Sequence, residues 1–378
     1  MQSKLPHIGT TIFTQMSMLA AEQNAVNLGQ GFPGFSIDMH LGELVSKYIR
    51  KGYNQYAPMQ GVSELRQNIS TKIENAYGHR YDHNDEITIT AGGTQAIYTA
   101  ITALVHEGDE VILFSPAYDC YSPAVELSGG SCVWVELYYP EYRINWENLQ
   151  KKINHRTRMI IINTPHNPSG TCMTSDDMKQ LEKLIAGTDI YVLSDEVYEH
   201  IVFDGVQHES IARYPALAAQ SMIVFSFGKT FHNTGWKMGY ICGPAALMTE
   251  FRKVHQFNVF SCNTPVQYAL AEYMEDEANY KGLSKFYQEK RDYFLQGIGN
   301  SRFAFSPSQG TYFQLLSYEG MYKEKDTDLA IHFTKSHKIA SIPCSSFYPD
   351  HLDQHVLRFC FAKDEETLSR AVRILSAI

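Results

Sequence analysis

The sequence lacks an apolar run long enough to span a bilayer, and it contains no pair of cysteines at the spacing C-x-x-C. Positive charge is also scarce, because 32 lysine and arginine residues face 41 aspartate and glutamate residues and leave a formal net charge of −9. Nucleic acid and anionic membrane surfaces repel a protein of this charge. We therefore expect neither nucleic acid nor a membrane as a partner.

Cysteine is sparse and scattered. The seven cysteines are odd in number and widely separated along the chain, which is typical of reduced thiols in a cytoplasmic protein. The N-terminal apolar stretch contains Gln15 and Ser17 and follows no basic segment, so we expect no signal peptide. We also expect no bound metal ion.

At 378 residues, the chain is long enough for one large domain and a smaller one. Short apolar runs alternate with helical stretches from about residue 86 onward, and several runs are apolar on both faces. This alternation predicts an α/β domain with a mostly parallel sheet. The seven candidate strands are 86–90, 110–114, 132–137, 159–162, 190–193, 222–225 and 239–242.

The pattern changes after about residue 265. A long helical stretch is expected over 265–291, followed by strand candidates at 311–316 and 355–361 and a closing helix from Glu365. The early run 25–28 has no strand partner nearby in sequence, so we expect it to join this later part. We therefore predict a large domain over 38–279 and a smaller α+β domain made of residues 1–37 and 280–378.

Polar side chains follow three of the predicted strands. Asn167 lies in an Asn-Pro-Ser-Gly segment after one strand, Asp195 and Tyr198 follow the next, and Lys229 follows a third. Each of these residues also has an ordinary structural explanation. The Asn-Pro-Ser-Gly segment could be a simple turn, Asp195 could be a solvated loop charge, and Tyr198 could pack in the core. Lys229 could be a charge on the surface. Parallel strands bring their carboxyl ends to one edge, where ligands bind, so together these side chains indicate a catalytic site.

A fourth strand end suits an anion. Gly92, Gly93 and Thr94 follow a predicted strand and open a predicted helix. The N–H groups at a helix N-terminus attract negative charge, and glycines allow close approach of the backbone. A plain strand-to-helix turn would fit these residues equally well if they stood alone.

Two nucleotide-binding motifs are only partly matched. Gly228-Lys229-Thr230 resembles the end of a P-loop, but that motif requires a glycine where this chain has Ile223. The segment from Gly29 to Gly34 matches G-x-G-x-x-G, yet it contains Pro33, opens no predicted helix, and has no acidic residue about 20 positions later. We therefore expect neither a P-loop nor a dinucleotide site.

As an ordered set these motifs resemble a known family. Ser226-x-x-Lys229, Gly235-Trp-Lys237-x-Gly239, Asn167-Pro-x-Gly170, Asp195-x-x-Tyr198 and Val356-Leu-Arg358-Phe are similar to segments of the class I aminotransferases of fold type I, which use pyridoxal 5′-phosphate. Within that family, the segments 27–33 and 116–121 resemble the branch of methionine and kynurenine/glutamine aminotransferases. The resemblance covers nearly the whole chain.

The resemblance implies a role for each residue around the cofactor ring. Lys229 would bond to the cofactor aldehyde and later move a proton at the substrate Cα. Asp195 would face the pyridine nitrogen and keep it protonated. Asn167 and Tyr198 would donate hydrogen bonds to the ring oxygen, and Tyr118 would stack on the ring face.

The resemblance also implies how the two anionic groups are held. Gly92, Gly93, Thr94, Ser226 and Lys237 would bind the cofactor phosphate. Lys237 stands where most of the family has arginine, so the charge is kept but the bidentate fork is lost.

The remaining implied contacts concern the substrate and a second subunit. Arg358 would bind the substrate α-carboxylate, with Asn167 and the backbone of Gly31 beside it. The family's active site is completed across a homodimer, and Tyr56 is the candidate to reach the neighbouring subunit's phosphate.

The sequence therefore predicts an aminotransferase that exchanges an amino group between an L-amino acid and a 2-oxo acid in a ping-pong reaction. Phe32, Tyr53 and Tyr118 near the expected pocket favour methionine, aromatic or glutamine-like side chains. A C–S β-lyase would share every cofactor contact and stays open as an alternative. A non-catalytic module of this fold is disfavoured, because such modules usually accompany a DNA-binding segment, for which this chain has no room.

Overall fold

The centre of the computed structural model, which describes residues 2–378, is a seven-stranded sheet. Its strand order is β2-β8-β7-β6-β5-β3-β4, and only β8 runs against its neighbours. All seven predicted strands are present, and the predicted α/β class with a mostly parallel sheet is confirmed. The strands are β2 (Ile87–Thr90), β3 (Glu110–Ser115), β4 (Ser131–Glu136), β5 (Thr157–Asn163), β6 (Tyr191–Asp195), β7 (Ser221–Ser226) and β8 (Gly239–Cys242).

Helices cover both faces of this sheet, which is why the strands are apolar throughout. Val111 and Leu113 of β3 pack in one core cluster, whereas Ile112 and Phe114 of the same strand belong to the other. The first cluster contains α4 (Gly93–Leu104), α5 (Tyr121–Leu127) and α10 (Ala245–Asn258). The second contains α3 (Ser63–Tyr77), α6 (Trp146–Lys152), α7 (Ser175–Ile185) and α8 (Pro215–Ala218).

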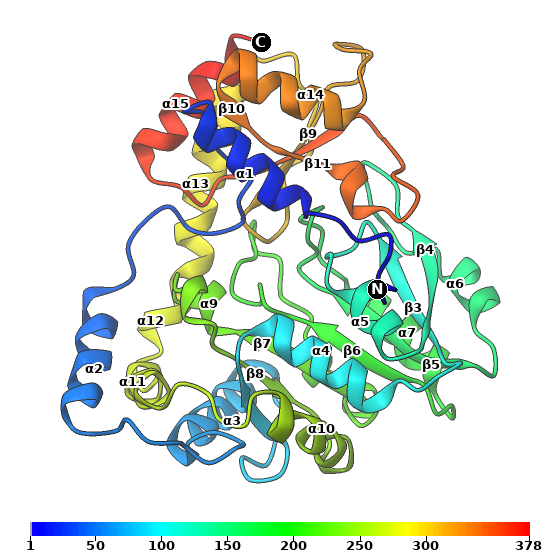
Figure 1. Cartoon of the computed structure of the whole chain (residues 1–378), viewed down its shortest axis with the longest axis vertical. Coiled ribbons are helices and arrows are strands. Elements are labelled where there is room, and N and C mark those ends of the chain that lie inside the picture. Colours follow the sequence, from blue (N-terminus) through cyan, green and yellow to red (C-terminus); the bar gives the residue numbers. More distant parts are fainter. Residues whose placement is uncertain (1) are drawn as a thin grey trace.

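A second group of elements combines the two ends of the chain (Figure 1). Strands β11, β12 and β9 form an antiparallel sheet, and β1 pairs in parallel with β10, more than 300 residues later in the chain. The early strand-like run therefore does join the C-terminal part. The bounds are α1 (Ile12–Glu22), β1 (Val26–Asn27), β9 (Phe313–Ser317), α14 (Asp326–His332), β10 (Ile339–Ala340), β11 (Ile342–Pro343), β12 (Val356–Cys360) and α15 (Glu365–Ser376).

The single long helix expected over 265–291 is wrong, because the structure divides this stretch into three helices. They are α11 (Thr264–Met274), α12 (Ala278–Lys281) and α13 (Leu283–Ile298). The Asp276 side chain accepts a hydrogen bond from the backbone N–H of Ala278 and so competes with continuation of α11. A further break follows at Gly282, between α12 and α13. α11 packs against α2 (Met39–Arg50) and α3.

Short elements connect these layers. α9 (Phe227–Thr230) follows β7 directly and places Lys229 just beyond the sheet edge. Among residues 2–378, none of the helices has the length and apolar content that crossing a membrane requires. The remaining elements are the 3-10 helices η1 (Ile211–Arg213), η2 (Thr234–Trp236) and η4 (Cys344–Phe347), and the π-helical turn η3 (Phe333–His337).

Candidate active site

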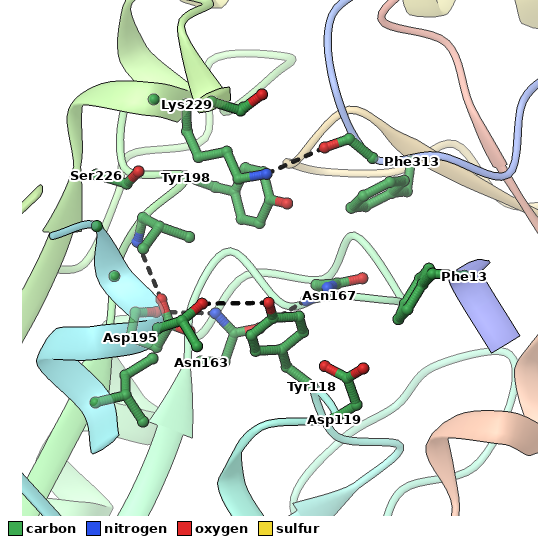
Figure 2. A pocket seen from close by; sticks show the side chains of 18 of the residues that line it. Phe13, Tyr118, Asp119, Asn163, Asn167, Asp195, Tyr198, Ser226, Lys229 and Phe313 are labelled. Atoms are coloured by element: carbon green, nitrogen blue, oxygen red, sulfur yellow. Dashed lines mark hydrogen bonds between the residues drawn. The ribbon is translucent and has the colours of Figure 1, made fainter. Parts of the chain in front are cut away.

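A cavity of about 240 Å³ lies at the carboxyl ends of the parallel strands, where Asn163 of β5 pairs in register with Asp195 of β6 (Figure 2). Its walls come from both parts of the chain. They include nearly all of the residues predicted from the sequence: Gly31, Gly92, Gly93, Thr94, Tyr118, Asn167, Asp195, Tyr198, Ser226, Lys229, Lys237 and Arg358.

Tyr56 lies outside this cavity. Its side chain is 81% exposed and packs edge-on against Phe260, with ring centroids 5.1 Å apart. Phe32 and Tyr53 were expected near the pocket, but neither lines it. Tyr53 instead packs against other tyrosines near α2 and α11, so the expected contribution of these two rings to the pocket is wrong for a single chain.

Lys229 projects from α9 into the cavity. Its amine donates hydrogen bonds to the carbonyl of Gly31 at 3.1 Å and to the hydroxyl of Tyr312 at 2.7 Å. Burial lowers the pKa of Lys229 to about 8, because desolvation disfavours the charged form. The neutral amine is therefore accessible near neutral pH, in agreement with a lysine that closes an apolar strand.

Asp195 is almost completely buried at the end of β6. Its Oδ2 accepts a hydrogen bond from the Tyr121 hydroxyl at 2.6 Å, and its Oδ1 accepts one from the backbone N–H of Val197 at 3.3 Å. Burial raises the pKa of Asp195 to about 6, and the two hydrogen bonds oppose that rise. The carboxyl is thus held in place by donors that favour its charged form.

Arg358 is the largest fully buried side chain of the protein. It donates from Nη1 to Oδ1 of Asn167 at 2.7 Å and from Nη2 to the carbonyl of Gly29 at 3.0 Å, and its guanidinium lies 3.8 Å from the ring centroid of Phe313. Its buried Nε has no partner among the described residues. An anion with two oxygens is the natural partner of a fixed guanidinium with a donor left over.

The opposite end of the cavity forms an anion cradle. Gly92 has φ +84° and precedes the first residue of α4, which carries no acidic residue in its first turn. A Cβ placed on Gly92 would lie 3.6 Å from Cε and Nζ of Lys237, so the ammonium sits against the backbone there. Thr94 and Ser226 add hydroxyls to the same wall.

Several lining residues were not singled out from the sequence. Asn163 donates from Nδ2 to the carbonyl of Asp195 at 2.9 Å and accepts from the backbone N–H of Asn167 at 2.7 Å, which joins the ends of β5 and β6. Asp119 lies within the segment 116–121 that resembles the family, and Asn163 directly follows the strand predicted over 159–162, so both positions carried a usable signal. Phe13 of α1 and Phe313 of β9 reach the cavity from distant segments, and no local pattern marks them.

The comparisons with known proteins agree with this geometry. A family model described as aminotransferase class I and II matches residues 23–375. The methionine aminotransferase of Escherichia coli K12 is 47% identical over 375 residues, which are 99% of this chain and 97% of that protein. Human kynurenine–oxoglutarate transaminase 3 is 33% identical, over 99% of this chain and 89% of that protein.

A solved structure is equally similar. The crystal structure of YbdL from Escherichia coli, for which a methionine aminotransferase function was identified, superimposes with a TM-score of 0.98 and 46% sequence identity. The match covers 100% of this chain and 99% of that one. The likeness therefore extends over both parts of the fold and over the cavity between them.

Proposed function

We propose that this chain, which belongs to the class I and II aminotransferases, transfers the amino group of L-methionine and similar L-amino acids to a 2-oxo acid. It is a pyridoxal-phosphate-dependent aminotransferase, and the preference for methionine is the part we propose. The observation that carries the proposal is the meeting of an amine of lowered pKa, a buried carboxylate and a fixed guanidinium in one cavity: Lys229, Asp195 and Arg358.

The residues fit pyridoxal phosphate at both of its polar ends. The N-terminus of α4 with Gly92, Gly93 and Thr94, together with Ser226 and Lys237, offers donors to a phosphate group. The hydroxyl of Ser226 and the amine of Lys237 have no hydrogen-bond partner within residues 2–378, so both are free to bind an anion. Asp195 lines the same cavity and would supply the carboxylate that a protonated ring nitrogen needs.

When bound, pyridoxal phosphate supplies a reactive aldehyde and a ring that accepts electrons. Lys229 acts as the base that takes up and returns a proton at the substrate Cα, for which its pKa of about 8 is suited. Asp195 would stabilise a positive charge on the ring nitrogen. Asn167 and Tyr198 would donate hydrogen bonds to the ring oxygen, and Tyr118 would stack on the ring.

Substrate binding is assigned to the other end of the cavity. Arg358 binds the α-carboxylate through its free donor, beside Asn167 and the backbone of Gly31. The side chain of the substrate then lies among the apolar rings of Phe13 and Phe313. An uncharged, flexible side chain such as that of methionine suits those walls.

The assembly, the domains and the location are also proposals. We propose a homodimer in which Tyr56 reaches the neighbouring subunit's phosphate, supported by its exposure outside its own cavity. We retain the division into residues 38–279 and a smaller domain of residues 1–37 and 280–378, supported by the β1–β10 pairing. The seven cysteines are all free thiols, which supports the cytoplasm.

The visible absorption spectrum of the purified protein tests this function. We expect a yellow band with pyridoxal phosphate that bleaches when L-methionine is added without an oxo acid, and that returns when a 2-oxo acid follows. Pyruvate and ammonia released from cystathionine without an oxo acid would favour the β-lyase.

Lys229→Ala provides the second test, because removal of the amine removes the base. We expect transamination to fall by at least about a thousandfold, consistent with loss of a group that is both nucleophile and base. Lys285→Ala, at an exposed lysine of α13, is the matched control and should keep full activity. Retained turnover in Lys229→Ala would overturn the assignment.

A further inference from the structure

Asp119 places a second carboxylate in the active-site cavity. It follows Tyr118 in the segment between β3 and α5 and lines the same cavity as Lys229 and Arg358. Figure 2 shows Asp119 on the same side of the view as Phe13 and away from Ser226, and the charge of Arg358 acts on its carboxyl. It therefore belongs to the part of the cavity that receives the substrate.

The Asp119 carboxylate is unpaired. Its side chain is exposed, and its own backbone N–H donates a hydrogen bond to its carboxylate. Within residues 2–378, no other residue donates to it and no cation lies within ion-pair distance. Desolvation by the cavity walls raises its pKa, and the positive charge of Arg358 opposes that rise. Arg358 itself is engaged with Asn167 and Gly29 and forms no ion pair with Asp119, so the carboxylate is only partly compensated and leaves negative charge in this wall.

The α-carboxylate of a substrate can bind Arg358 without neutralising the negative charge of Asp119. Asp119 makes no contact that the substrate would have to break, and its charge stays in the wall after binding. The rings that share this end of the cavity, Phe13 and Phe313, offer no positive charge to a side chain. Lys229 and Lys237, the remaining cations of the cavity, have their roles at the cofactor.

We propose that Asp119 is a specificity-determining residue that repels a second carboxylate, so that the amino acid and the 2-oxo acid used by this enzyme are both monocarboxylic. The inference rests on the proposed function, because it concerns the side-chain end of the same substrate site. It applies to donor and acceptor alike, since both halves of a ping-pong exchange occupy one cavity. Aspartate, glutamate and their oxo acids are thereby disfavoured against methionine and other neutral substrates.

The expected size follows from Coulomb's law. Two like charges about 6 Å apart at an effective dielectric constant of about 20 repel each other enough to reduce binding roughly a hundredfold. Partial access of water reduces this, so roughly tenfold or more is the expected contribution of Asp119 to selectivity. A neutral side chain experiences no such penalty.

The test compares Asp119→Asn with the unchanged enzyme. We expect Asp119→Asn to raise the ratio of kcat/KM for the half-reaction with L-glutamate to that with L-methionine by roughly tenfold or more. Asp119→Glu keeps the charge and should keep the wild-type ratio. Asp176→Asn removes one exposed negative charge on α7 and should also leave the ratio unchanged, because that charge is remote from the cavity.

Equilibrium binding gives a readout that is independent of turnover. The dissociation constants of the unreactive dicarboxylate maleate and of the monocarboxylate 4-methylpentanoate are measured by calorimetry on the cofactor-loaded protein. We expect Asp119→Asn to tighten maleate binding roughly tenfold and to leave 4-methylpentanoate unchanged. Asp119→Ser is the second neutral variant and should behave in the same way.

The outcomes separate the two proposals. An unchanged glutamate-to-methionine ratio and unchanged maleate binding in both neutral variants would overturn the role of Asp119. Equal shifts for glutamate and methionine would do the same, because they would indicate a general change of the cavity. Failure of the wild-type enzyme to react with methionine would count against the proposed function, whereas the maleate comparison would still decide the role of Asp119.

Discussion

In the proposed function, Asp195 must stay charged to face a protonated ring nitrogen, yet its burial raises its pKa to about 6. The hydroxyl of Tyr121, itself buried, donates to Asp195 Oδ2 at 2.6 Å and stabilises the charged form. Tyr121 belongs to α5, whereas Asp195 ends β6, so the bond joins two elements as well as two side chains. Tyr121 acts through Asp195 and is a positioning residue.

Tyr121→Phe tests this role. Loss of a hydrogen bond to a charged acceptor costs about 1.5–3 kcal/mol, which corresponds to a rise of about one to two units in the pKa of Asp195. Because the carboxylate must be ionised, we expect the acidic limb of the kcat profile to move to higher pH and pyridoxal phosphate to bind more weakly. The pH dependence of kcat and the cofactor dissociation constant measure both effects.

The matched control is Tyr318→Phe, which removes the hydrogen bond from a buried tyrosine that does not line the cavity to the carbonyl of Glu324. It should reduce stability without moving the pH profile. An identical profile in Tyr121→Phe and in the wild type would contradict the positioning role.

At the scale of elements, the turn after β6 is held in place by two glutamates that do not line the cavity. Asp195 and Tyr198 line the cavity, whereas Glu196 and Glu199 do not. Glu196 accepts hydrogen bonds from the backbone N–H of Ile211 at 3.0 Å and from the hydroxyl of Ser194 at 2.9 Å. These bonds tie the turn to neighbouring segments, while Asp195 and Tyr198 project into the cavity.

The strongest anchor is a buried ion pair between Glu199 and Lys72 of α3, joined by the hydroxyl of Tyr77. Burial alone would raise the pKa of Glu199, but Lys72 outweighs that effect and lowers it to about 2. Since the folded-state pKa is depressed, the stabilisation is complete above the unfolded-state pKa near 4.5 and is lost as the pH falls toward 2. Loss of this ion pair therefore contributes to the unfolding of the protein in acid.

Lys72→Met should be strongly destabilising, because it leaves a buried carboxylate without a partner. Removal of one partner of a buried pair costs about 3–5 kcal/mol. The free energy of unfolding in urea at neutral pH measures this loss. We expect the double variant Lys72→Met/Glu199→Gln to recover part of the lost stability. It should also lose less stability than the wild type as the pH falls from 4.5 to 2. Additive effects of the two substitutions would contradict coupling between the two charges.

At the scale of the whole molecule, three of the exposed large aromatic rings form a group. Phe257 and Phe260 are close in sequence, and Tyr56 contacts Phe260. Phe257 is 88% exposed and lies near the end of α10, and Phe260 packs against the exposed Tyr56. Such a patch favours a second copy of this chain, which would cover the rings and bring Tyr56 to the neighbouring cavity.

Phe257→Lys is expected to weaken the proposed dimer, because it would place a charge among the exposed rings that a second copy would cover. Sedimentation velocity should then show a shift toward monomer, with a parallel loss of cofactor affinity. Tyr138→Lys introduces the same charge at another exposed ring, beside Glu136, and should leave both unchanged. A dimer that survives Phe257→Lys at micromolar concentration would place the interface elsewhere.

The sequence by itself determined the seven strands and the polar residues at their ends. Apolar runs, turn residues and glycines act through neighbouring positions, so their effect is readable locally. This is why the strands and most of the lining side chains could be predicted, from Gly92 at one end of the cavity to Lys229 in its wall.

Only the tertiary structure decided which distant segments complete the site. Arg358 and Asn167 are 191 residues apart in sequence, and Phe13 reaches the same cavity from the N-terminal helix. The Tyr121–Asp195 bond, the unpaired charge of Asp119 and the division of the 265–291 helix likewise depend on packing or on local competition that periodicity does not record. Contacts between segments far apart in the chain arise from the burial of whole faces, which no short stretch of sequence encodes.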